Sequence, residues 1–171
     1  MAGFQSERPR YARLSFRQQA ILNSLPRPSV GRFRPWAISA VGRDGHNYPN
    51  VLVGNADDFF AIWGVWPRDD RGKSEIDIRS VEDFHPSPNA MPVSCLNKQV
   101  ISEIGMGGNG FALEFEDGRI LDCTTGNASQ FLNLPEGYSI EKIVDIHPYR
   151  IRGGTNVGAE FLWCLYDGDP H

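Results

Sequence analysis

Residues 126–132 read GNASQFL and residues 54–60 read GNADDFF, so one short pattern occurs twice in this chain. A second pattern follows each copy, IRSVEDFHP at 78–86 and IEKIVDIHP at 140–148. Both patterns recur in the same order, which indicates an internal duplication that would determine the architecture. Eighteen positions separate residue 60 from 78 and eight separate 132 from 140, so the first copy carries ten more residues.

In the first half, helix and strand signals precede the repeated patterns. Ser15 and Gln18 fit a capping box that predicts a helix over residues 15–25. The apolar stretch 36–41 predicts a strand, which an Asp-Gly turn folds onto residues 51–53 as a hairpin.

The second half follows the same plan. Apolar residues at helical spacing predict a helix over 94–104. Alternating residues at 111–115, an Asp-Gly turn and residues 120–123 predict a second hairpin. Residues 161–168 look like the first strand and turn of a third copy that the C-terminus cuts short.

We therefore predict an α+β fold: one antiparallel, β-rich domain of two similar helix–hairpin–turn–strand units with pseudo-twofold symmetry and a C-terminal closing strand. A flexible basic N-terminal end at 1–11 precedes this single globular domain, 12–171. The domain consists of a first unit at 12–86, a second unit at 93–148, and a closing strand and tail at 149–171.

The charge of the chain is unevenly distributed. Residues 1–43 carry eight arginines and one acid, a net charge of +7, whereas residues 44–171 carry −11 of the total of −4. A basic arm before an acidic body is typical of an arm that binds nucleic acid or membrane, or of a targeting peptide. The alternative is an arm that folds back along its own acidic body.

Hydropathy and cysteine usage predict a cytoplasmic protein. No apolar run reaches the ~18 residues needed to cross a bilayer, and the N-terminus lacks the apolar core of a secretory signal. Cys95, Cys123 and Cys164 are odd in number and lie in apolar surroundings. They argue against a disulfide framework and are expected to be buried.

The additional residues of the first copy, which fall within 61–73, are the first candidate site. They combine two tryptophans with a charged loop, and Trp and Arg are enriched at the centres of protein interfaces. On strand parity the two indoles point to opposite faces, so one of them would be free for a partner. The alternative is a longer strand with core tryptophans and a solvated tip. The predicted partner-binding residues are Trp63, Trp66, Arg68, Asp69, Asp70 and Arg71.

The second candidate site is formed by two Asp-His pairs. Asp83 and His85 lie two residues apart in one repeat, and Asp145 and His147 lie two apart in the other. Residues at this spacing in a strand share a face, so the four side chains could meet on the pseudo-twofold axis as a metal site or an acid–base site. Alternatively, each carboxylate simply bonds its imidazole where the strand ends.

Familiar catalytic motifs do not occur. Residues 105–110, GMGGNG, match G-x-G-x-x-G, but a helix is expected before them and a strand after them, the reverse of a dinucleotide-binding turn. The chain has no G-x-S-x-G, C-x-x-C pair, H-E-x-x-H or Walker A sequence. We therefore expect no cofactor, and we favour a protein without catalytic activity.

These observations rank three functions. The first is a protein-binding module whose acidic surface docks a basic partner, such as an inhibitor or immunity-type protein that neutralises a protein acting on nucleic acids. The second is a metal-binding or small-ligand-binding protein, or a hydrolase, that uses the Asp-His pairs. Direct nucleic-acid binding by Arg10, Arg13 and Arg17, interleaved with Tyr11 and Phe16, ranks third, because the acidic body opposes it. No membrane partner is expected.

Overall fold

The helix α1 (Phe16–Asn23) begins where the sequence predicts it. In the computed structural model, which describes residues 7–151 and 153–168, the Ser15 hydroxyl accepts a hydrogen bond from the Gln18 amide at 3.1 Å. The Gln18 side-chain oxygen accepts one from the Ser15 amide at 3.0 Å, which completes the capping box. The helix then packs its apolar side against the first sheet.

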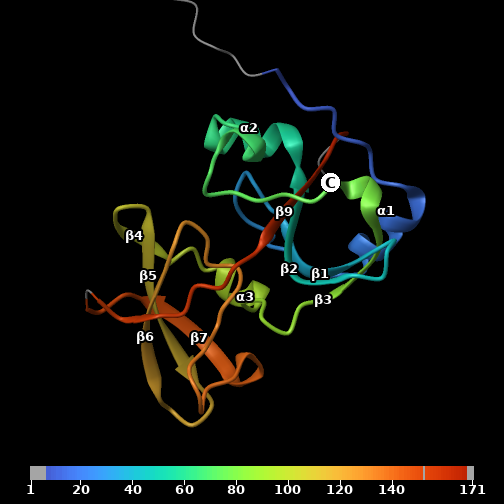
Figure 1. Cartoon of the computed structure of the whole chain (residues 1–171). Coiled ribbons are helices and arrows are strands. Elements are labelled where there is room, and N and C mark those ends of the chain that lie inside the picture. Colours follow the sequence, from blue (N-terminus) through green and yellow to red (C-terminus); the bar gives the residue numbers. More distant parts are fainter. Residues whose placement is uncertain (1–6, 152, 169–171) are drawn as a thin grey trace, which may run out of the picture.

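The first sheet has four strands in the order β3-β1-β2-β9 (Figure 1). Strands β1 (Trp36–Gly42) and β2 (Asn47–Asn55) form the predicted hairpin. Strand β3 (Val81–Pro86) lies antiparallel to β1, and β9 (Leu162–Tyr166) lies parallel to β2. The last strand of the chain therefore covers an edge of the first sheet.

The second sheet is built around β5 (Gly108–Phe115). Strand β6 (Ile120–Thr125) pairs with it antiparallel, as the predicted second hairpin. Strands β4 (Ser102–Gly105) and β7 (Ile143–Pro148) also pair antiparallel with β5, along successive stretches of it. The short strand β8 (Thr155–Asn156) lies parallel to β6.

The two sheets share a pairing order. The first strand of each hairpin also pairs with a strand that follows the hairpin in sequence: β1 pairs with β3, and β5 pairs with β7. The second strand of each hairpin has a parallel neighbour, β9 for β2 and β8 for β6. A 3-10 turn precedes the third strand in both, η2 (Ile78–Ser80) and η3 (Ile140–Lys142). The chain thus forms a strand-rich α+β domain with two mixed sheets of four and five strands. The prediction of an antiparallel architecture is wrong at β9 and β8, because the chain crosses over to reach each of them.

The helix predicted over residues 94–104 is wrong beyond its first turn. Helix α3 (Val93–Leu96) is four residues long, and Gln99 has a φ of +53°. A non-glycine residue in this left-handed region interrupts a right-handed helix. The apolar residues farther along belong to the region of strand β4 instead, since a short apolar run fits either structure until its partner is known.

The additional residues of the first copy also begin as a helix. Helix α2 (Ala56–Trp63) starts at Asn55, whose side chain caps the first turn, and ends at Gly64 with a φ of +66°. The 3-10 turn η1 (Pro67–Asp69) follows. Strand parity therefore does not decide how the two tryptophans point.

Three apolar clusters fill the molecule. The first packs α1 against one face of the first sheet, and the second fills one face of the second sheet. The third joins α2 to the other face of the first sheet and takes in Phe131 from the second half of the chain. We call this third group the aromatic cluster; its buried members are Leu52, Ala56, Phe59, Trp66, Phe131, Trp163 and Leu165.

The basic N-terminal arm contacts the acidic body at Arg8 and Ala12. Arg8 pairs with Asp57 at 2.9 Å and with Asp167 at 3.0 Å. The Asp167 amide donates a hydrogen bond to the Ala12 carbonyl at 2.9 Å, which adds the arm to the end of β9. The arm is thus docked on the body at these two residues. Residues 1–6 of the predicted flexible end lie outside the described residues.

Candidate functional site

The tryptophans of the first copy lie in the aromatic cluster and not on an open surface. Trp66 is 3% exposed and stacks on Phe60 with ring centroids 4.4 Å apart. Trp63 is half-buried, with its ring 6.3 Å from that of Trp163. The prediction that one indole points away from the core is wrong, because a helix and a turn direct both rings toward β9 and the arm. Trp66 is therefore a core residue.

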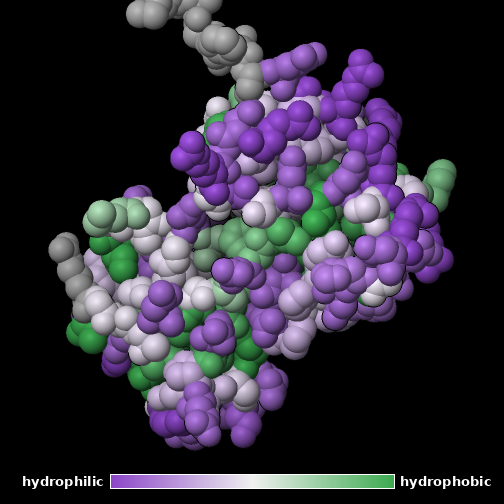
Figure 2. Space-filling model, viewed as in Figure 1, coloured by the Kyte–Doolittle hydropathy of each residue, from purple (hydrophilic) through white to green (hydrophobic). Residues whose placement is uncertain are grey.

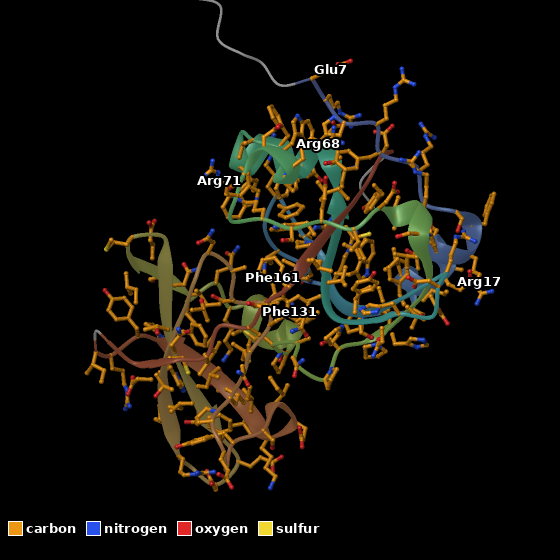
Figure 3. All side chains as sticks on the ribbon, viewed as in Figure 1. Glu7, Arg17, Arg68, Arg71, Phe131 and Phe161 are labelled. Carbon is orange, nitrogen blue, oxygen red and sulfur yellow. The ribbon has the colours of Figure 1, made fainter. Side chains whose placement is uncertain are left out.

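The charged loop that follows is exposed. Arg68, Asp69 and Arg71 are exposed, and Figure 3 shows Arg68 and Arg71 at the surface beside α2. Asp70 differs, because it forms an ion pair with Lys73, and this contact lowers the pKa of the Asp70 carboxyl. The Lys73 side chain is only 7% exposed.

Lys73 bridges the loop and the aromatic cluster. Its ammonium lies 4.4 Å from the centroid of the Trp63 ring while it pairs with Asp70. A cation over an indole face is attracted by the ring quadrupole. The charge of Lys73 is thus compensated inside the protein, and the loop is fixed to the body at this point.

The loop forms one wall of a groove of about 490 Å³. The start of β2 forms a second wall, and the segment that enters β9 forms the third. Figure 2 shows apolar surface in the middle of the molecule with hydrophilic surface around it, and Figure 3 places Phe161 there. The groove is lined by Tyr48, Pro49, Asn50, Gly72, Lys73, Ser74, Ala159, Glu160, Phe161, Leu162 and Trp163.

The groove holds one carboxylate without an internal counter-charge. Glu160 is exposed, and it forms no ion pair with any residue in the ranges 7–151 and 153–168. Its carbonyl accepts a hydrogen bond from the Asn50 side chain at 2.9 Å, which ties the segment to β2. Three aromatic side chains, Tyr48, Phe161 and Trp163, line the same groove. The groove therefore combines a fixed negative charge with aromatic surface.

The two Asp-His pairs lie on different sheets. Asp83 and His85 are on β3, with the Asp83 carboxylate 3.4 Å from the His85 Nε2 atom. Asp145 and His147 are on β7, where they form one cluster of ligand-type atoms with Glu114 on β5. Neither Asp83 nor His85 belongs to that cluster. The four predicted residues thus do not assemble into one site.

Glu114 was not among the predicted residues. It lies directly opposite Asp145 in the β5–β7 pairing, whereas the first sheet has Val41 opposite Asp83. Strand alternation in residues 111–115 already places Glu114 on the face opposite the apolar side chains. That Glu114 lies close to Asp145 follows only from the pairing of β7 with β5, which the sequence did not predict.

Three arginines near the start of β1 line a smaller pocket of about 200 Å³. These are Arg27, Arg32 and Arg34, and the pocket also contains Asp58 and Tyr166. Burial and the neighbouring Arg34 charge lower the pKa of Arg27, whose guanidinium lies 4.2 Å from the centroid of the Trp36 ring. Part of the basic charge is thus held against the first sheet.

The cysteines are free and buried, as the sequence predicts. Burial raises the pKa of Cys123 to about 12, and it also raises the pKa values of Cys95 and Cys164. Thiols with such values stay protonated at neutral pH and are poor nucleophiles. Cysteine chemistry is therefore not supported.

The glycine-rich residues 105–110 span the end of β4, a turn at Met106 and Gly107, and the start of β5. Because no helix follows this turn, it is not a dinucleotide-binding turn. Among the described residues, the helices are all too short or too polar to cross a membrane. No family model, curated protein or solved structure matches this chain.

Proposed function

We propose that this chain is a non-catalytic protein-binding module that captures a cationic segment of a basic partner in the groove beside β9. The uncompensated carboxylate of Glu160, next to Tyr48 and Phe161, is the observation that carries the proposal. A lysine or arginine side chain from the partner would meet both a counter-charge and aromatic faces there. Cation–π contacts of this kind contribute about 0.5–2 kcal/mol.

The net charge supports the same partner. Residues 44–171 carry −11, and an acidic surface accelerates capture of a cationic protein at low salt. Proteins that act on nucleic acids present cationic surfaces, so an inhibitor or immunity-type protein is the biological role we infer. Cytoplasmic location remains part of this proposal.

Direct nucleic-acid binding by the N-terminal arm ranks lower. Arg8 already pairs with Asp57 and Asp167, and the acidic body would repel phosphates brought close to the arm.

The architecture suggests why the groove lies where it does. We propose that the shared strand pairing of the two sheets reflects an internal duplication with pseudo-twofold symmetry. The groove breaks this symmetry, since Gly72 and Lys73 at one wall belong to the additional segment of the first copy. Function would thus reside where the copies differ.

An oligoarginine peptide labelled with a fluorophore tests the proposal by anisotropy. Wild type should bind the peptide at low salt, and Glu160→Gln should weaken binding by roughly 5- to 10-fold, the loss of one charge-assisted contact. Phe161→Ala should also weaken binding, because it removes an aromatic wall. Binding of all forms should decline as salt rises.

Glu136→Gln is the matched control. Glu136 is exposed, lines none of the groove, and its substitution changes the net charge by the same amount. We expect little change in peptide affinity. Equal losses in both variants would mean that the peptide senses only net charge, and this would contradict a binding site in the groove. A native partner retained by wild type but not by Glu160→Gln would identify the target.

A further inference from the structure

We propose that Glu114, Asp145 and His147 form a binding site for a divalent cation of the zinc class on the outer face of the second sheet. This inference is independent of the groove. It rests on the positions of three ligand-type atoms and on the hydrogen bonds that the surrounding groups already make.

Strand pairing brings the three side chains together. Glu114 on β5 lies opposite Asp145 on β7, and His147 lies opposite Ala112, two residues from Glu114. Opposite and alternate residues share a face, so all three project from the side that faces away from the buried Leu113 and Ile146. The backbone of two paired strands thus fixes their relative positions.

The distances fit an ion better than a hydrogen bond. The His147 Nε2 atom lies 3.6 Å from the nearest Glu114 oxygen and 4.0 Å from Asp145 Oδ2, and the three ligand atoms lie within 4.8 Å of one another. A direct hydrogen bond would bring a nitrogen and a carboxylate oxygen to about 2.7–2.9 Å. Two ligands bound tetrahedrally at about 2.0–2.2 Å are about 3.3–3.6 Å apart. A small inward movement would therefore complete the coordination.

Polar atoms of these groups that lack a hydrogen-bond partner also point to a ligand. Within the described residues, the His147 Nε2 atom is buried and has no hydrogen-bond partner. Asp145 uses its Oδ1 atom to accept from the Ile146 amide at 2.7 Å and to bind Lys98. Its Oδ2 atom remains directed toward the histidine. Lys98 and the amide thus orient the carboxylate without occupying the coordinating oxygen.

The donor set indicates the class of cation. One imidazole nitrogen with two carboxylate oxygens suits borderline ions such as Zn²⁺ and Co²⁺, whereas Mg²⁺ and Ca²⁺ prefer oxygen ligands alone. Three protein ligands leave a fourth position for water or another ligand. Among the described residues, Asp83 and His85 of the first sheet do not form such a set, because Val41 occupies the position that corresponds to Glu114.

Titration with Co²⁺, followed by its visible absorption, and with Zn²⁺ by calorimetry tests the site in the full chain. Wild type should bind one equivalent of Co²⁺, which Zn²⁺ displaces. Glu114→Gln and His147→Ala should each weaken binding at least 10-fold, within the usual range for loss of one ligand or its support. Zn²⁺ should also raise the Tm of wild type, because it binds the folded state.

His85→Ala is the control from the first sheet, where an Asp-His pair stands without a third ligand, and it should leave Co²⁺ binding unchanged. Urea unfolding of each variant without metal shows whether it is folded. If His147→Ala does not fold, Glu114→Gln, which keeps the shape of the side chain, provides the test. Absence of Co²⁺ binding by wild type would overturn the proposal. So would an unchanged affinity in folded Glu114→Gln, or a loss in His85→Ala equal to that in His147→Ala.

Discussion

Gly154 shows how a single missing side chain allows two backbone segments to approach. A Cβ atom at this position would lie 2.7 Å from the carbonyl carbon and oxygen of Asp122 on β6. These are backbone atoms, which cannot rotate away as a flexible side chain can. We therefore expect Gly154→Ala to destabilise the protein by roughly 1–3 kcal/mol, the usual cost of overpacking. Urea unfolding at equilibrium measures this change in the free energy of unfolding.

Gly126→Ala is the control for this prediction. A Cβ atom there would meet nothing within 4 Å, and the residue does not have a left-handed φ. The free energy of unfolding should change by less than about 0.5 kcal/mol. It could also rise slightly, because alanine reduces the conformational entropy of the unfolded chain. Equal destabilisation by both alanines would show that close approach at Gly154 is not the cause.

Some residues of the fold and site could be predicted from the sequence, and others could not. Ser15 and Gln18 act within one turn, so their capping box was evident. Asp145 and His147 were recognised from strand spacing, but Glu114 joins them only through the pairing of β7 with β5. Glu160 has no local signal at all, because its significance depends on what the groove brings beside it.

Among the elements, the N-terminal arm is attached to the body partly by a charge network at Arg8. The Arg8 guanidinium lowers the pKa of the Asp167 carboxyl below its usual 3.8 by hydrogen bonding, against a smaller opposing effect of burial. A lowered folded-state pKa means that this contact stabilises the docked arm above the unfolded pKa. The stabilisation is lost as pH falls through the lowered value.

We expect Arg8→Ala to weaken the docking of the arm at neutral pH. The Asp167 amide, which donates to the Ala12 carbonyl at 2.9 Å, should then exchange with deuterium faster, and the pKa of Asp167 should rise toward its usual value in an NMR titration. Arg10→Ala is the control, since Arg10 is exposed and makes no ion pair among the described residues. Unchanged Asp167 exchange in Arg8→Ala would contradict the role of this pair.

The elements also show which patterns mislead. Both hairpins were predicted correctly, because their Asp-Gly turns have positive φ at Gly45 and Gly118, at +83° and +85°. The apolar spacing over 94–104 predicted a helix that ends early, since β4 gains its stability from hydrogen bonds to β5. Pairing with the next strand in the chain outweighed the helical spacing of the apolar residues there.

At the scale of the whole molecule, the aromatic cluster links the two halves. Phe131 from the second half lies 6.1 Å from Phe161, which lies 5.5 Å from Trp163 on β9, measured between ring centroids. Trp163 continues the chain of contacts to Phe59 on α2 at 4.8 Å. Figure 3 shows Phe131 and Phe161 in the middle of the molecule. This arrangement predicts that the two sheets unfold together.

Trp163→Ala tests that coupling. The side chain is 3% exposed, and its removal should destabilise the protein by roughly 3–5 kcal/mol, as for other buried tryptophans. Because the halves share the aromatic cluster, deuterium exchange should accelerate by the same factor at the most protected amides of β1 and of β5, although no residue of β5 belongs to that cluster. Phe16→Ala is the control, since Phe16 is 99% exposed and its loss should change neither set. Faster exchange confined to the first sheet would instead mean that each sheet unfolds as a separate cooperative unit, and that the aromatic cluster stabilises only the half in which most of its members lie.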